Sequence, residues 1–129
     1  MTNQAKNLTA ANIKYLLVMK RLYSDEKGIR STDIAKALGI TKPSVHTMIK
    51  ALQTMKLVKK DRYGIVWFTS DGKELTNRYA EYFETVMAQL NSLLPDDADT
   101  CSAACAMIAE LTEEDIKAMC ENINTETGD

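Results

Sequence analysis

Apolar residues recur every three or four positions through most of this chain, which is the spacing of amphipathic helices. A first helix is expected from about Thr9 to Tyr23, and Thr9 can cap the free amides at its start. The polar segment SDEKG then breaks the pattern. A second, shorter helix is expected to begin at Ser31 and to end at Gly39, because glycine commonly follows the last turn of a helix.

A third helix is expected almost immediately afterwards. Thr41 can cap it, and Pro43 falls in its first turn, where a missing N–H does no harm. Its inward positions are apolar: Val45, Met48, Ile49 and Leu52. Its outward positions carry polar or charged side chains: Thr41, Lys42, Ser44, His46, Thr47 and Lys50.

The pattern then changes to that of two short strands. Leu57–Asp61 and Ile65–Thr69 are strand-like, and Arg62-Tyr63-Gly64 joins them. Gly64 can supply the positive φ that a hairpin turn needs. Helix, tight turn, second helix and basic hairpin together are the sequence outline of a winged helix-turn-helix, whose second helix fits the major groove of DNA.

A long helix is expected from Ser70 to about Leu94, where Pro95 ends it. Its apolar stripe is broad, and a helix of this length protruding from a small domain needs a partner for that stripe. We expect a second copy of the chain to cover it. The stripe, and hence the predicted dimerisation surface, consists of Leu75, Tyr79, Tyr82, Phe83, Val86 and Leu90. Two shorter helices are expected over residues 97–109 and 113–122.

These elements predict a mainly α-helical fold with a small β-wing. We expect a winged helix-turn-helix DNA-binding domain over residues 1–70, a helical dimerisation domain over residues 71–124 and a disordered tail over residues 125–129. The charge supports this division. Residues 1–70 hold 13 basic and 4 acidic side chains, whereas residues 71–129 hold 3 and 14. A basic first half suits phosphate neutralisation, although both halves would also make ordinary solvated surfaces.

The residues expected to contact DNA lie on the outward face of the third helix and in the hairpin. Polar groups at the start of such a helix meet base edges, and a basic wing lies over phosphates or the adjacent minor groove. The alternative is a merely solvated surface. The candidates are Thr41, Lys42, Pro43, Ser44, His46, Thr47, Lys50, Lys60, Arg62 and Tyr63. Trp67, on the outgoing strand, is expected in the core.

Composition excludes several other classes of protein. No apolar run approaches the length of about 20 residues that a membrane helix needs, and the N-terminus lacks the apolar core of a signal peptide, so we expect a cytoplasmic protein. Three cysteines without a secretion signal argue against a disulfide framework. There is no Gly-rich phosphate loop and no nucleophile–His–acid set, so we do not expect an enzyme.

Cys101 and Cys105 are four residues apart on an expected helix, so both sulfurs face one way. Such a pair could bind a thiophilic metal or respond to oxidants. The alternative is that both are small buried residues within an alanine-rich helix. Cys120 stands alone.

The layout resembles the diphtheria toxin repressor family of iron- and manganese-dependent regulators. The resemblance covers about Tyr15 to Thr112 and rests on YLLVMKRLYSDEKG, STDIAKALGITKPSVHTMIKAL, LVKKDRYGIVWFTSDGKEL and CSAACAMIAELT. Without the SH3-like domain of longer members, the chain is most similar to the short manganese-responsive ones. The resemblance implies DNA binding by residues up to about 70 and a two-fold dimer built by the later helices.

The family's metal ligands do not carry over. Where the family has ligands, this chain has other side chains: Lys14, Leu17, Phe83, Met87, Ile108 and Ala109. Cys105 alone remains of the family's Cys/Glu-x-x-Glu-His motif, and Cys101 stands where some members have a histidine. A hard divalent ion prefers oxygen and nitrogen donors. We therefore expect no metal at the family site and no conventional manganese or iron activation.

The leading hypothesis is a regulator, acting as a repressor, that binds a palindromic operator in double-stranded DNA as a homodimer. Two alternatives remain open. One is a regulator that senses a thiophilic or divalent metal, or an oxidant, through Cys101 and Cys105. The other is a dimeric winged-helix scaffold that has lost DNA binding.

Overall fold

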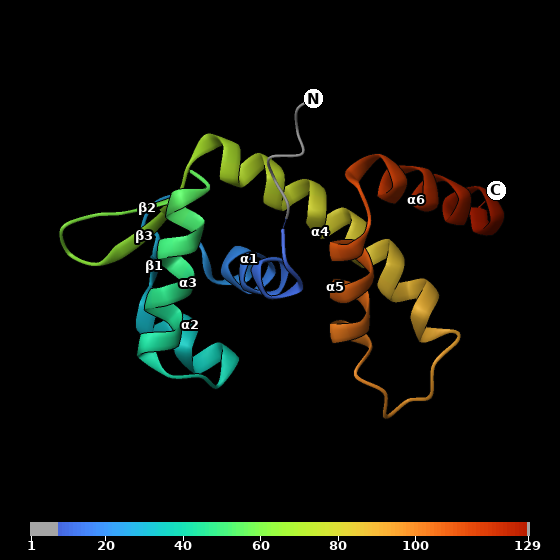
Figure 1. Cartoon of the computed structure of the whole chain (residues 1–129), viewed down its shortest axis with the longest axis horizontal. Helices are drawn as coiled ribbons and strands as arrows, with labels where there is room; N and C mark the ends of the chain where they lie inside the picture. The colour runs from blue at the N-terminus through green and yellow to red at the C-terminus, as the bar shows by residue number, and fades with distance from the viewer. Residues whose placement is uncertain (1–7, 129) are drawn as a thin grey trace. The chain divides into compact units, whose positions relative to one another are not determined.

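The computed structural model describes residues 8–128 (Figure 1). In chain order the elements are α1 (Ala10–Leu22), β1 (Ile29–Arg30), α2 (Ser31–Leu38), α3 (Lys42–Thr54), β2 (Val58–Lys60), β3 (Ile65–Phe68), α4 (Ser70–Asn91), α5 (Thr100–Glu110) and α6 (Glu113–Gly128). The expected mainly helical fold with a small β-wing is confirmed. None of the helices in this described part combines the length and the apolar character that crossing a bilayer requires.

Packing divides the chain into two compact units. One consists of residues 15–77, and the other takes residues 78–128 together with residues 8–14. The sequence placed a boundary after residue 70, where the charge changes. By packing, the division falls between Asn77 and Arg78, so the first two turns of α4 belong with the wing. The assignment of DNA binding and dimerisation to separate domains stays a prediction.

The wing is the hairpin of β2 and β3 with the turn between them. It belongs to a three-stranded antiparallel sheet in the order β1-β3-β2. Val58 lies opposite Phe68, and Ile29 lies opposite Val66, so β3 is paired on both sides. The hairpin of β2 and β3 was predicted from the sequence. β1 was not, because two residues are too few to show the alternation of a strand. In Figure 1 the turn between β2 and β3 extends past the end of the sheet as a free loop.

The core of the unit formed by residues 15–77 comes from every element of the winged helix. Its side chains are exposed by 1% or less of their surface. They include Leu16, Met19, Ile34, Val45, Ile49, Leu52, Leu57 and Val66. The predicted inward face of α3 is therefore confirmed, except that Met48 is only half-buried.

The predicted helix ends are confirmed by hydrogen bonds. Thr9 Oγ1 accepts from the amide of Asn12, and Thr41 Oγ1 accepts from the amide of Ser44. Gly39 ends α2 with φ at +67°, and its amide donates to carbonyl oxygens of the last turn. Gly64 closes the hairpin with φ at +83°. These residues fix where α3 begins and how the wing turns.

The beginning of α4 is held tightly against the end of the α3–β2 connection. Thr69 Oγ1 donates to the carbonyl oxygen of Lys56 at 2.8 Å, with that of Leu57 at 3.1 Å, and it accepts from the amide of Gly72. A β-carbon added at Gly72 would stand 1.8 Å from the carbonyl oxygen of Leu57. Only glycine allows the helix to approach the backbone this closely.

The other unit is held by buried apolar side chains and by one polar cluster. Val86, Ile108 and Ile116, from α4, α5 and α6, are each exposed by 1% or less. Arg78 Nε donates to Glu113 Oε2 at 2.7 Å, and the hydroxyl of Tyr82 donates to the same oxygen at 2.7 Å. Burial acts to raise the pKa of Glu113, but the hydrogen bonds from Arg78 and Tyr82 outweigh it, and the pKa is lowered. The cluster therefore ties α6 to α4 through an ionised carboxylate.

We expect Glu113→Gln to destabilise the protein by about 1 kcal/mol at pH 7, a modest value because both charged partners are partly exposed to solvent. Because folding lowers the pKa of Glu113, its contribution is present above the ordinary glutamate pKa of about 4.3 and is lost as the pH falls through the lowered value. Urea unfolding at pH 7 and pH 3 measures this. The difference between native protein and variant should shrink at pH 3, and an equal difference at both pH values would contradict the argument.

Three predictions for the C-terminal helices need correction. α4 ends at Asn91 rather than Leu94, because the last residues before Pro95 form turns. α5 begins at Thr100 rather than residue 97, because Asp99 caps it by accepting from the amide of Ser102. The tail predicted to be disordered over residues 125–129 is helical to Gly128, since no helix breaker precedes that glycine, and Asp129 lies outside the described residues.

Most side chains of the stripe predicted for dimerisation are already buried within the single chain. Leu75, Tyr79, Tyr82 and Val86 are each exposed by 8% or less. Such residues have little surface left for a second copy. Phe83 and Leu90 are half-buried, and they are the members of the stripe that a partner could reach.

Candidate nucleic-acid interface

The exposed side of α3 begins with short hydroxyl side chains. Thr41 Oγ1 donates to Ser44 Oγ at 3.0 Å, and Thr47 Oγ1 donates to the carbonyl oxygen of Pro43 at 3.1 Å. The hydroxyl proton of Thr47 is thus engaged by the helix, and its oxygen remains an acceptor towards solvent. Small side chains here allow the first turn of α3 to approach a flat surface closely. This is the turn that helix-turn-helix proteins place against base edges.

A side-chain hydrogen bond joins the wing to α3. Lys60 Nζ lies 3.1 Å from Nδ1 of His46. An ammonium group can only donate, so Nδ1 is the acceptor and the ring proton of a neutral His46 is on Nε2. His46 is exposed, so this N–H is free to meet an acceptor on a base edge, such as N7 or O6 of guanine. We therefore expect Lys60 to position His46 as well as to supply a positive charge.

The turn of the wing is organised by one acidic side chain. Asp61 Oδ1 accepts from the amides of Tyr63 and Ile65, and Oδ2 accepts from the indole N–H of Trp67 at 3.0 Å. The hydrogen bond from Trp67, followed by those from the backbone, lowers the pKa of Asp61. Trp67 was predicted in the core and is only half-buried, because its N–H is needed at the base of the wing.

The tip of the wing presents a cation and an aromatic ring to solvent. Tyr63 is 78% exposed, and the guanidinium carbon of Arg62 lies 5.8 Å from the centre of its ring. An exposed aromatic side chain this large has no packing role in the chain itself. Arginine beside an aromatic ring suits the phosphates and sugars of a minor groove.

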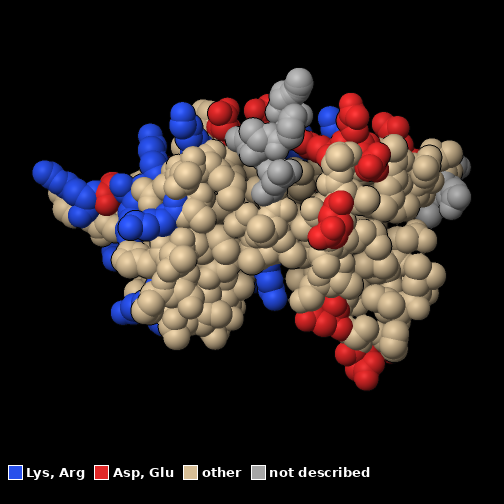
Figure 2. All heavy atoms as spheres, viewed as in Figure 1, with Lys and Arg blue, Asp and Glu red and all other residues tan. Residues whose placement is uncertain are grey.

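The charge of this surface has one sign. From Lys42 to Phe68 the chain holds six basic side chains, and its one acid, Asp61, is occupied within the turn. Figure 2 shows lysine and arginine atoms gathered over the wing, whereas aspartate and glutamate atoms gather over the unit that contains α5 and α6. The wing and α3 therefore form a cationic surface suited to a polyanion.

The ten residues predicted from the sequence fall on this surface. All are exposed except Lys60, which is half-buried against His46. The sequence missed Arg30, an exposed cation of β1 that joins the same sheet by pairing with Ile65. No pattern in the sequence placed Arg30 near the wing, because that proximity depends on strand pairing. Whether each of these residues contacts DNA stays a prediction.

The cysteines have the character of packing residues. All three are free, Cys105 is 1% exposed, and burial, with a smaller contribution from Cys101, raises the pKa of its thiol to about 11. A thiol with a raised pKa supplies little thiolate for a metal or an oxidant at neutral pH. Among the described residues, no three side chains of His, Cys, Asp or Glu lie close enough together to hold a metal ion.

Residues 14–62 match the IclR helix-turn-helix domain, which runs here from α1 to the turn of the wing. No curated protein sequence matches the chain. Solved structures are similar over most of its length. The hypothetical protein SSo2273 from Sulfolobus solfataricus is 26% identical with a TM-score of 0.64, and the match covers 94% of this chain and 90% of that one.

Two solved regulators are also similar. The manganese regulator SloR is 20% identical with a TM-score of 0.67, and the match covers 88% of this chain and 52% of SloR. IdeR of T. acidophilum is 22% identical with a TM-score of 0.61, with coverage of 87% and 53%. The chain thus spans about half the length of these regulators. The resemblance to the metal-dependent repressors is confirmed at the level of the fold. The match to a helix-turn-helix domain supports DNA binding.

The contact between Lys60 and His46 leads to a test of base readout. Lys60→Met keeps the aliphatic stem but removes the donor to Nδ1, so the His46 ring should populate both neutral tautomers. Nitrogen NMR of this histidine, the only one in the chain, measures the change in protein without a tag. We also expect the variant to discriminate about 5-fold less against a base change opposite His46, on the scale of one good base contact.

Lys59→Met is the matched control, since Lys59 precedes Lys60 on β2 and is exposed. It should lower affinity for every sequence alike and leave the His46 tautomer unchanged. If both variants alter base discrimination equally, Lys60 has no positioning role.

Proposed function

We propose that this protein is a transcriptional repressor that binds a palindromic operator as a homodimer. The observation that carries the proposal is the surface shared by α3 and the wing. It combines short polar side chains at the start of α3, an oriented histidine and a basic wing with an exposed Arg62–Tyr63 tip. Those groups supply base contacts and phosphate contacts together, which is what a sequence-specific reader of DNA requires.

The proposal of a homodimer rests on exposed apolar side chains in the acidic unit, which is the unit that contains α5 and α6. Leu93 is 69% exposed and Met107 is 38% exposed, and Phe83 and Leu90 are half-buried. We propose that a second copy covers these four residues. A two-fold dimer presents two copies of α3, and an operator with half-sites about one helical turn apart matches that symmetry.

We further propose that manganese and iron do not activate the protein. The positions that resemble the family's ligands hold an ammonium group at Lys14, a ring at Phe83 and alkyl groups at Leu17, Ile108 and Ala109. None of these side chains donates to a hard cation, and Lys14 repels one. The raised pKa of Cys105 also weighs against a cysteine-based sensor at this place.

Selection of bound duplexes from a random pool, followed by fluorescence anisotropy on the enriched sequence, tests the proposal. We expect a palindromic sequence, two chains per duplex, affinity that falls steeply with salt, and no change when Mn²⁺ replaces EDTA. Enrichment of a sequence without two-fold symmetry would contradict the proposal that a homodimer binds the operator. Failure to bind any duplex at 50 mM salt would favour the scaffold that has lost DNA binding.

A further inference from the structure

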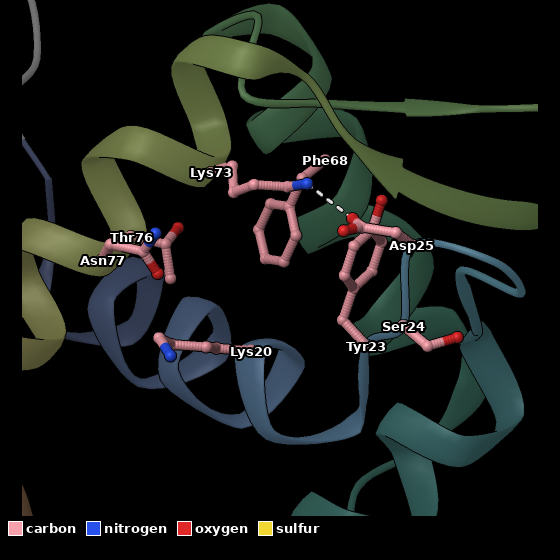
Figure 3. A pocket seen from close by; sticks show the side chains of 8 residues that line it. All are labelled: Lys20, Tyr23, Ser24, Asp25, Phe68, Lys73, Thr76 and Asn77. Atoms are coloured by element: carbon pink, nitrogen blue, oxygen red, sulfur yellow. Dashed lines mark hydrogen bonds and ion pairs between the residues drawn. The ribbon is translucent and has the colours of Figure 1, made fainter.

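A cavity of about 330 Å³ lies within the unit of residues 15–77, and no residue of α3 lines it. Its walls come from the end of α1, the loop that follows it, the end of β3 and the second turn of α4 (Figure 3). The volume is at the lower end of the range of small-molecule sites, enough for a ligand of roughly ten to fifteen non-hydrogen atoms. None of the groups proposed to read DNA lines this cavity.

One wall carries a buried hydroxyl group without a partner. Thr76 is 1% exposed, and its Oγ1 has no hydrogen-bond partner among the described residues. A threonine inside a helix commonly donates back to the preceding turn, as Thr47 does in α3. Leaving such a group unpaired costs free energy, so an unsatisfied hydroxyl at a cavity wall indicates a ligand that pairs with it.

Two cations flank the cavity on opposite sides. Lys20 comes from α1 and Lys73 from α4, and Figure 3 shows them on either side of the space that Thr76 borders. Asp25 pairs with Lys73 at the opening, and both side chains remain largely exposed. Within the described part of the chain, the ammonium group of Lys20 forms no ion pair. One positive charge in the cavity is thus left uncompensated.

The remaining wall is aromatic. The rings of Tyr23 and Phe68 meet edge to face with their centres 4.9 Å apart, and both line the cavity. These rings offer an apolar surface opposite Lys20, and the ammonium group of Lys73 lies over the Tyr23 ring, 5.8 Å from its centre. A ligand that fits has a negatively charged head for Lys20 and Thr76 and a flat apolar body for the rings.

We propose that this cavity binds a small organic carboxylate with an aromatic or similarly flat body. Its carboxylate pairs with Lys20 and accepts from Thr76 Oγ1, and its body lies against Tyr23 and Phe68.

The cavity is connected to the wing by contacts between neighbouring side chains. Tyr23 also meets Trp67 edge to face at 6.4 Å, and Trp67 donates to Asp61, which organises the turn. A ligand that shifts Tyr23 therefore disturbs the base of the wing. We expect the carboxylate to act as an effector of DNA binding. This role rests on the proposed function, whereas the binding of the carboxylate to the cavity does not.

Trp67 reports the binding, because it is the only tryptophan in the chain and contacts a residue of the cavity wall. Phenylacetate is the probe, and phenylacetamide, of the same shape but neutral, is its control. We expect a saturable change in Trp67 fluorescence with phenylacetate at millimolar concentrations and an affinity at least 10-fold lower for phenylacetamide. No saturable change with phenylacetate up to 50 mM overturns the site.

Two variants locate the bound anion. Thr76→Val removes the hydroxyl and keeps the shape, so the fold should be retained while phenylacetate affinity falls about 5-fold. Lys20→Met should lower it about 10-fold, and Lys36→Met, at an exposed position of α2 outside the cavity, should leave it unchanged. Equal losses in Lys20→Met and Lys36→Met would mean that phenylacetate responds only to net charge, and the site would be refuted.

The effector role is tested separately, with the enriched duplex. Saturating phenylacetate should change operator affinity at least 3-fold in the native protein and leave it unchanged in Lys20→Met. Binding without this change overturns the effector role and keeps the site. If no duplex binds at all, the fluorescence titration still decides whether the carboxylate site exists.

Discussion

Gly72→Ala is expected to destabilise the protein by about 3 kcal/mol or more, although alanine normally stabilises a helix by about 1 kcal/mol relative to glycine. The reversal comes from the 1.8 Å separation between the added β-carbon and the carbonyl oxygen of Leu57. The backbone fixes the position of the β-carbon, and the carbonyl oxygen belongs to the backbone, so no rotation of a side chain relieves the clash. α4 would have to move off the α3–β2 connection, breaking the hydrogen bonds that Thr69 makes there.

Urea unfolding followed by Trp67 fluorescence measures this, since Trp67 lies in the same unit as Gly72. Gly39→Ala is the matched control. Gly39 has a positive φ, but no atom lies within 4 Å of an added β-carbon, so only the backbone conformation opposes the change. We expect a cost of about 1 kcal/mol there. Equal costs at the two glycines would show that close approach is not what fixes Gly72.

Reversing two charges on the cationic surface should reduce operator affinity at least about 100-fold at physiological salt. Lys50→Glu and Arg62→Glu place acids on the exposed face of α3 and at the tip of the wing. In a homodimer the double variant loses four phosphate contacts. Each lost contact should also lower the slope of log affinity against log salt by about 0.9. Anisotropy titrations at several salt concentrations measure both effects.

Lys117→Glu controls for net charge in that experiment. Lys117 is an exposed residue of α6 in the acidic unit, and its reversal should change operator affinity by less than about 2-fold. A large loss in Lys117→Glu would mean that total charge, rather than the wing and α3, governs binding. If the double variant loses no operator affinity, the wing and α3 do not bind DNA, and the alternative of a winged-helix scaffold is favoured.

Local signals predicted the winged helix well, for reasons that particular residues make plain. Thr41, Pro43 and Gly39 act within a few residues of their own position, so their effect on α2 and α3 can be inferred from the sequence. The same holds for Gly64 in the hairpin. β1 could not be predicted this way, because Ile29 and Arg30 become a strand only through pairing with β3.

The site was harder to predict where it depends on distant residues meeting. His46 and Lys60 are fourteen positions apart, and their contact follows from how β2 returns alongside α3. Likewise, nothing local distinguishes Tyr82 as a partner of Glu113 from Tyr82 as part of an outward stripe. The sequence identified an apolar stripe on the long helix, but it could not tell which part of that stripe the chain itself would cover.

The place of β3 between β1 and β2 bears on how this protein can vary among its relatives. Since β3 is paired on both edges, the sheet does not depend on the length of the loop at its end. Insertions and substitutions at Arg62 and Tyr63 would fall on an exposed turn, where such changes are tolerated best. The tip of the wing can therefore change without loss of the fold, and under the proposed function such changes would alter the DNA preference.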